Sequence, residues 1–229
     1  MVEILVVIAI IALLAAVAIP SLNASRLSAS RAKSAGNLKN FGAAMYTYAA
    51  DNNGMMPGAD GGSSGTLSGI SPIAKSSAAN SLQVQLMTYL EKERPSGNEW
   101  GTFFMKSLAY PAWQSFNGGT EDNQIPGYVA CQSYTLHDGS KFSPFGGPAK
   151  TQLPMRMVAM QAKLSSIPSS EPKPYAVIEV DQDILTIIGS SASWKKNLST
   201  NALHGKVRNV LYFDGSVAAV ATNNQPKPW

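Results

Sequence analysis

Four groups of residues in this chain have types and positions that could do chemistry. Carboxylates and imidazoles bind metal ions or carry protons, and a thiol can act as a nucleophile. The groups are Glu3, the pair Asp181 and Asp183, the lone Cys131, and the set of His204, Asp214 and Gly215. No nucleophile, base and orienting group can be assembled from them, so the sequence predicts no enzyme and no cofactor.

Glu3 stands at the start of an apolar run that extends without interruption from Ile4 to Ile19. A carboxylate at the edge of a membrane-spanning helix is costly unless it has a partner. The N-terminal ammonium of a neighbouring copy is a suitable cation, because pairing would desolvate both charges together and select one axial register between adjacent helices. We therefore expect Glu3 to be an assembly residue, with a position among the lipid headgroups as the alternative.

The set of His204, Asp214 and Gly215 has two interpretations. The imidazole could bind a metal ion together with Asp214 or Asp181, or it could hydrogen-bond a C-terminal β-hairpin. Asp214-Gly215 lies between two β-rich runs and is the favoured signal for a two-residue hairpin turn. We favour the structural interpretation and expect the purified head to bind no stoichiometric metal.

The remaining two groups carry weaker signals. Asp181 and Asp183 could offer oxygen atoms to a calcium ion, but two acids one residue apart make a weak cation site, and a turn or strand end explains them better. Cys131 has no second cysteine to pair with, so a small buried hydrophobe is favoured over a free reactive thiol. One cysteine and two histidines also exclude a Cys/His zinc cluster within one chain.

The elements that must position these residues fall into two parts, residues 1–54 and 55–229. The chain has 229 residues, which is enough for a long helix and one mid-sized head. Hydrophobic residues make up 45% and charged residues 14%, and after Glu3 the next charge is Arg26. The net charge of +4 is too diffuse to predict a specific nucleic-acid partner.

Residues 1–54 are expected to form one long helix. Its membrane or filament-core part, residues 1–20, is apolar on every face, reaches the length of a membrane span and lacks the basic start and cleavage site of a secretory signal. In residues 21–54 apolar side chains recur at helical spacing, and Gly54 provides the stop. A helix to about Asn52 would be roughly 78 Å long, which suits a filament better than a head of this size.

The head, residues 55–229, is expected to be α+β. Residues 55–79 read as a flexible surface loop whose serines and threonine could carry glycans, and residues 81–93 read as a short helix. Dense aromatic residues between Trp100 and Phe145 are expected to build the core rather than a stacking surface for bases or sugars. An antiparallel sheet over about 175–221 would contain the runs Tyr175–Asp181, Ile184–Ile188, Val207–Phe213 and Val217–Ala221.

Glu3, the apolar run and Pro20, which follows the glutamate by 17 residues, resemble the N-terminus of mature type IV pilins and type II secretion pseudopilins. His204, nine further residues and Asp214-Gly215 resemble the C-terminal motif of a large group of pilin-like proteins. Asn37-Leu38-Lys39 and the stretch from Tyr48 to Gly54 fit the same group, whereas residues 55–165 match nothing. Mature pilins have the glutamate fifth, so we expect about two residues to be missing before Met1.

The resemblance implies a structural subunit that polymerises through its N-terminal helix into an extracellular type IV pilus-like filament. Its implied partners are copies of itself in a helical homopolymer, the inner membrane before assembly, a prepilin peptidase that also methylates the new N-terminus, and pilus or secretion assembly machinery. A minor pilin or a type II secretion pseudopilin is the alternative, and a membrane-anchored binding module or enzyme is less favoured.

Pro20 is expected to interrupt the helix in the assembled state. It has no N–H, so the Ala16 carbonyl loses its intrahelical partner, and related filaments contain a melted stretch before this proline. We expect non-helical backbone between Ala12 and Leu22 in the assembled state.

Overall fold

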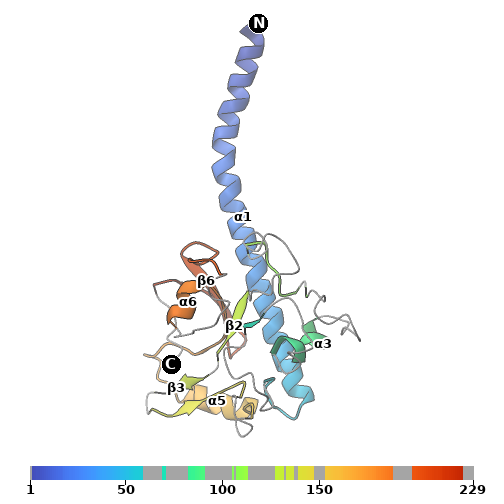
Figure 1. The fold of residues 1–229 in the computed structure, drawn as a ribbon, viewed down its shortest axis with the longest axis vertical. Coiled ribbons are helices and arrows are strands. Elements are labelled where there is room, and N and C mark those ends of the chain that lie inside the picture. The colour runs from blue at the N-terminus through green and yellow to red at the C-terminus, as the bar shows by residue number, and fades with distance from the viewer. Residues whose placement is uncertain are drawn as a thin grey trace.

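The computed structural model describes residues 2–58, 69–70, 82–90, 105, 107–112, 127–131, 133–136, 139–146, 153–187 and 198–223. One long helix, α1 (Val2–Asp51), leads into a head that combines short helices with an antiparallel sheet (Figure 1). The expected α+β class, with a long apolar helix before a C-terminal antiparallel sheet, is confirmed. The 50 residues of α1 span about 75 Å at 1.5 Å per residue.

The stop of α1 lies where the sequence predicted it. Asn53 and Gly54 have φ values of 52° and 77°, which is the left-handed conformation that commonly ends a helix. The Gly54 N–H donates to the Ala49 carbonyl over 2.7 Å, which satisfies one of the last carbonyls of the helix. The chain then turns back into the head.

The second half of α1 packs against the head through two zones of different chemistry. From residue 30 to 37 the buried α1 side chains are all polar, and we call them the polar zone: Ser30, Ser34 and Asn37. From residue 38 to 49 the buried residues are apolar, and we call them the apolar zone: Leu38, Phe41, Gly42, Ala44, Met45 and Ala49. Both zones follow the three-and-four spacing of one helix face.

The sheet has five strands in the order β1-β2-β5-β6-β7, and every neighbouring pair is antiparallel. Its strands are β1 (Gly69–Ile70), β2 (Tyr128–Ala130), β5 (Tyr175–Glu179), β6 (Val207–Tyr212) and β7 (Val217–Ala221). Strands β5, β6 and β7 confirm three of the four expected runs, while β1 and β2 were not predicted. All five residues of central β5 are buried, which explains why that run is apolar on both faces until its last residue.

One expected strand is wrong. Ile184–Ile188 was predicted as β, but residues 182–187 form the helix α6 (Gln182–Ile187). The Asp181 carboxylate accepts the Ile184 N–H over 2.9 Å, as an N-cap residue does, and Ile184 and Leu185 turn into the core together. The run is rich in residues that favour strands, but it forms a helix because Asp181, just before it, caps the helix N-terminus.

The rest of the described head surrounds this sheet. The short helices α2 (Leu82–Gln85) and α3 (Met87–Leu90) confirm the predicted helical segment over its described part. The helix α5 (Met157–Ser165) and the hairpin of β3 (Tyr134–Thr135) and β4 (Lys141–Phe142) were not predicted.

The aromatic residues expected to build the core are buried wherever the structure describes them. They are Tyr110, Tyr128, Tyr134, Phe142 and Phe145. Trp100, Phe103, Phe104, Trp113 and Phe116 lie outside the described residues, as does most of the expected loop over 55–79.

Candidate functional site

The first half of α1 projects away from the head with no covering from its own chain (Figure 1). Every described residue from Val2 to Ala29 is exposed, and Ile4 and Leu13 are 70% and 68% exposed. The apolar part has a mean hydropathy of 3.1 over 18 residues, so α1 is long and apolar enough to cross a membrane. A fully exposed apolar surface of this size requires lipid or other protein around it.

Glu3 and Pro20 mark the two ends of this exposed apolar segment. Glu3 lies in the first turn of α1, where an acid also interacts favourably with the helix dipole. Pro20 lies inside α1, and the helix runs through it from Val2 to Asp51 in the single chain. The expectation of non-helical backbone before Pro20 concerns the assembled state and stays a prediction.

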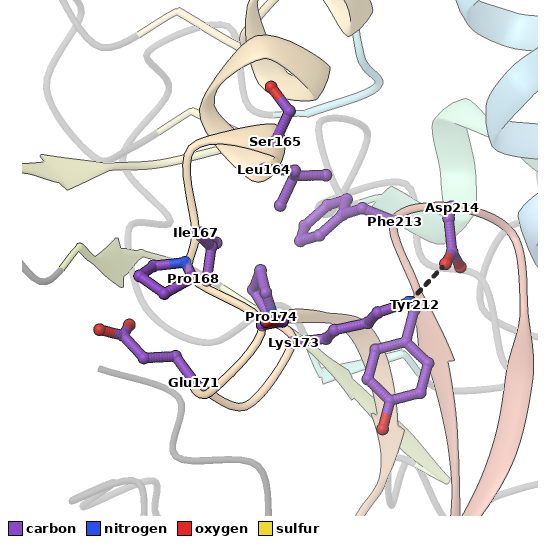
Figure 2. Close-up of a pocket in the computed structure, with 11 residues that line it drawn as sticks. Leu164, Ser165, Ile167, Pro168, Glu171, Lys173, Pro174, Tyr212, Phe213 and Asp214 are labelled. Carbon is purple, nitrogen blue, oxygen red and sulfur yellow. Dashed lines mark hydrogen bonds and ion pairs between the residues drawn. The ribbon is translucent and has the colours of Figure 1, made fainter.

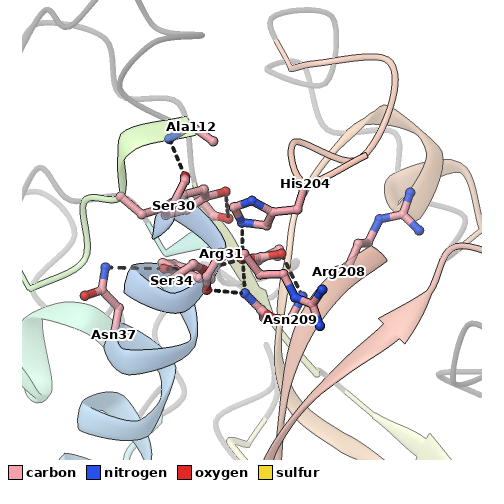
Figure 3. A network of polar contacts seen from close by, with 12 residues as sticks. Ser30, Arg31, Ser34, Asn37, Ala112, His204, Arg208 and Asn209 are labelled. Carbon is pink, nitrogen blue, oxygen red and sulfur yellow. Dashed lines mark hydrogen bonds and ion pairs between the residues drawn. The ribbon is translucent and has the colours of Figure 1, made fainter. Parts of the chain in front are cut away.

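A buried carboxylate, Glu179 at the end of β5, joins α1 to the sheet. Figure 3 labels its partners Ser34 on α1, His204 and Asn209. Glu179 accepts hydrogen bonds from the Ser34 hydroxyl, from His204 Nε2 over 2.9 Å, and from the backbone and side-chain N–H groups of Asn209 over 2.7 and 3.0 Å. Four donors around two carboxylate oxygens match the acceptor-only inventory of an ionised glutamate. Burying a carboxylate is costly without such pairing, so the four bonds explain how Glu179 is tolerated.

Further hydrogen bonds extend this network along α1. The Asn209 side chain donates to the Arg31 carbonyl over 3.0 Å, and Tyr128 OH lies 3.1 Å from the Ser34 hydroxyl. Asn37 donates to the Ala109 carbonyl, and the Ala112 N–H donates to the Ser30 hydroxyl, over 3.0 and 2.9 Å. Burial, and then the Glu179 charge, raises the pKa of Tyr128. The ring therefore remains a neutral hydrogen-bonding group at physiological pH.

His204 lies inside this network. Its side chain is fully buried, its ring lies 5.5 Å from that of Tyr110, and its partner is Glu179 rather than the C-terminal hairpin. Because the carboxylate can only accept, His204 Nε2 carries the hydrogen that is shared between them. Asp181 and Asp214 bond elsewhere, to Arg208 and to Ser216 and Lys173. Among the described residues, no group of three or more acidic, histidine or cysteine side chains could hold a metal ion.

Asp214 and Gly215 form the turn between β6 and β7, as expected, but the loop has three residues rather than two. Tyr212 pairs with Ser216, so Phe213, Asp214 and Gly215 form the loop, and Gly215 has a φ of 80°. This is a type I turn closed by a left-handed glycine. Burial opposes ionisation of Asp214, but hydrogen bonds from Ser216 and the nearby Lys173 ammonium outweigh it and lower the pKa of the carboxyl.

This turn also touches α1. Tyr46 donates its hydroxyl hydrogen to the Phe213 carbonyl over 2.6 Å. A Cβ atom added to Gly215 would lie 3.1 Å from Tyr46 Cε2, so only glycine lets the turn approach this ring without displacing it. The β6–β7 turn therefore contacts α1 near the C-terminal end of the helix.

Asp181 and Asp183 both face Arg208. Asp181 bonds the buried guanidinium through Nε and, over 2.8 Å, through Nη2, while Asp183 is 58% exposed and lies 3.7 Å from the same Nη2. A bidentate guanidinium–carboxylate pair of this kind is geometrically specific. In this structure the cation beside Asp181 and Asp183 is thus the Arg208 guanidinium of the same chain.

Cys131 follows β2 and is buried, as its favoured interpretation requires. Burial raises the pKa of its thiol to about 12. A thiol that stays protonated near neutral pH is a poor nucleophile. Its Sγ lies 3.3 Å from the Ser133 carbonyl, which it approaches as a weak donor.

A pocket of about 420 Å³ lies between the end of α5 and the β6–β7 turn (Figure 2). Its lining combines apolar residues with an exposed ion pair between Lys173 and Asp214, whose charged atoms lie 3.5 Å apart. The apolar residues are Leu164, Ile167, Pro168, Pro174, Tyr212 and Phe213. The sequence did not predict this pocket, because its walls come from two segments far apart in the chain, residues 164–174 and 212–214.

The most connected residues of the network were also missed. Ser34, Glu179 and Asn209 join α1, β5 and β6, yet none was singled out as a candidate. A weak signal was present, since Glu179 is an acid inside the apolar run from Tyr175 to Val180. Such a residue is buried only when it is paired.

The described residues form a long apolar N-terminal helix followed by a head with an antiparallel sheet, an arrangement consistent with a pilin-like architecture. Comparison with known proteins gave no match to a family model, a curated protein or a solved structure.

Proposed function

We propose that this chain is a structural subunit that polymerises through α1 into an extracellular filament of the type IV pilus kind. The observation that carries the proposal is the exposed apolar half of α1, whose 18-residue window is completely unburied by its own chain. In the membrane, lipid would cover this surface before assembly. In a filament, the same surface of neighbouring copies would cover it.

Glu3 would set the register of this assembly. It is the only charged residue before Arg26, so it enters an apolar bundle as an isolated carboxylate. The N-terminal ammonium of an adjacent copy would neutralise it, and removing one partner of a buried pair leaves an uncompensated charge. The inner membrane, a prepilin peptidase and an assembly machinery are the further partners of this proposal.

Glu3→Ala tests the proposal directly. We expect filaments in the sheared surface fraction to be lost or sharply reduced while the variant still partitions with membranes. Lys33→Ala, which removes an exposed charge from the head-proximal part of the same helix, is the matched control and should leave filament yield unchanged. Normal filament yield from Glu3→Ala would show that the pairing does not guide assembly.

A minor pilin or a type II secretion pseudopilin is the second candidate, and the pocket between α5 and the β6–β7 turn favours it. Pockets of 300–1,000 Å³ with apolar walls and a few polar groups commonly bind ligands. A major subunit would be the dominant protein of sheared filaments, whereas a minor subunit adapted for binding would be scarce there. Quantifying the chain in that fraction separates the two.

A further inference from the structure

The polar zone of α1 lies at the point where the helix leaves the head. Ser30 is the first buried residue of α1, and all described residues before it are exposed. From there to Asn37 the buried α1 side chains bond the head through the groups around Glu179 and through the Ala109 and Ala112 backbone (Figure 3). The first buried apolar side chain, that of Leu38, follows only afterwards.

The two zones respond differently to water. A hydrogen bond inside the head can be exchanged for hydrogen bonds to water at small net cost, provided that no buried group is left unpaired. The apolar zone loses hydrophobic stabilisation in proportion to its exposed area. Gly42 and Tyr46 add close contacts there, since a Cβ on Gly42 would lie 3.0 Å from Leu211 Cδ1 and Tyr46 bonds the β6–β7 turn. The polar zone is therefore the part that can open first.

One carboxylate controls the polar zone. Glu179 bonds Ser34 of α1, and it also orders Asn209, whose side chain bonds the Arg31 carbonyl. His204 reaches the same carboxylate from the loop before β6. An amide in place of this carboxylate keeps one acceptor oxygen and presents N–H hydrogens in place of the other, so the four donors could no longer all be satisfied and the bonds that hold α1 would weaken.

We propose that the polar zone is a releasable latch, held by Glu179, that lets α1 residues 30–37 detach from the head while the apolar zone stays packed. Such partial opening is a local unfolding unit at the edge of a more stable core. With the latch open, the head is attached from Leu38 onward, and the exposed helix is lengthened by about 12 Å, which is eight residues at 1.5 Å each. One consequence rests on the proposed function: in the filament, the heads could then tilt while the apolar zone of α1 stays packed.

Hydrogen exchange on the full chain in detergent micelles tests the latch without requiring filaments. Residues 21–29 of the same helix lie outside the head and provide an internal reference for a helix that the head does not protect. In the unmodified chain, amides in 30–37 should exchange more slowly than those in 21–29. In Glu179→Gln they should exchange about tenfold faster, a change of about 1.4 kcal/mol, while 41–49 stay within about twofold.

Two further variants keep the test decisive. Ser34→Ala removes only the helix side of the latch. It should also speed exchange in 30–37 and spare 41–49, with a smaller increase in rate, and it provides the test if Glu179→Gln fails to fold. Tyr46→Phe removes one hydrogen bond at the far end of the contact and should leave 30–37 unchanged. Equal acceleration of both zones in Ser34→Ala, or unchanged exchange in 30–37, would overturn the latch while leaving the filament proposal untouched.

Discussion

Replacing Gly215 by alanine should destabilise the head by about 2 kcal/mol. Its φ of 80° costs a residue with a Cβ about 1–2 kcal/mol, of which about 0.4–1 kcal/mol is returned because alanine restricts the unfolded chain. The new Cβ would lie 3.1 Å from Tyr46 Cε2, so the ring must move. That movement weakens the 2.6 Å hydrogen bond to the Phe213 carbonyl, which is worth about 0.5–1.5 kcal/mol. Gly215→Val should cost more, since a β-branched residue resists positive φ.

Gly139 offers a matched control for the backbone component. It has a φ of 79°, and a Cβ built on it meets no atom within 4 Å. Gly139→Ala should therefore show only the conformational cost, a net destabilisation of about 0–1.6 kcal/mol. Urea unfolding of both variants, followed by circular dichroism on the full chain in micelles, measures the difference. If Gly215→Ala is no more destabilising than Gly139→Ala, the contact with Tyr46 contributes nothing and the reasoning is refuted.

Three further predictions concern other parts of the chain. Burial raises the pKa of the Cys131 thiol to about 12, so Cys131 should resist iodoacetamide at pH 8 in the folded chain and react after unfolding. Above pH 9 the thiol ionises in the unfolded chain first, so the contribution of Cys131 to the free energy of unfolding falls as pH rises toward 12. Asp181→Ala should cost about 3–5 kcal/mol in urea unfolding, because the buried Arg208 loses its bidentate partner and keeps only the exposed Asp183, 3.7 Å away. Lys173→Ala, in an exposed pair, should cost below about 1 kcal/mol. Pro20→Ala should restore the missing helical bond, and a filament map should then show continuous helix where we expect non-helical backbone in the unmodified filament.

The sequence could predict elements whose signals are local. A long apolar run, a glycine stop and two β-rich runs around Asp-Gly are each signals carried by neighbouring residues, and α1, β6 and β7 appear where these signals lie. The same reasoning failed over 184–188. There the composition favoured a strand, and the deciding interaction was a hydrogen bond from Ile184 to the side chain of Asp181.

The candidate site was harder to predict because its bonds join distant parts of the chain. Ser34 and Glu179 are 145 residues apart, and Asn209 and Arg31 are 178 apart. A serine on a helix and an acid near the end of a strand carry no local sign of each other. The sequence identified His204 as structural in its favoured interpretation, but it assigned the hydrogen bond to the hairpin instead of to Glu179.

The structure gives a physical reason for the nine residues between His204 and Asp214. They include the whole of β6, and two residues of this stretch reach α1: Asn209, within the strand, bonds the Arg31 carbonyl, and the carbonyl of Phe213, just after the strand, accepts the Tyr46 hydroxyl. The helix rises about 22 Å from residue 31 to 46, whereas the strand covers about 13 Å from 209 to 213. The long Tyr46 side chain, which leans toward the helix N-terminus, makes up part of the difference. One residue more or less between the two ends would also turn alternate side chains of β6 to the opposite face. Asn209 and Phe213 are thus held at a fixed spacing because a strand of one length must meet a helix at these two points.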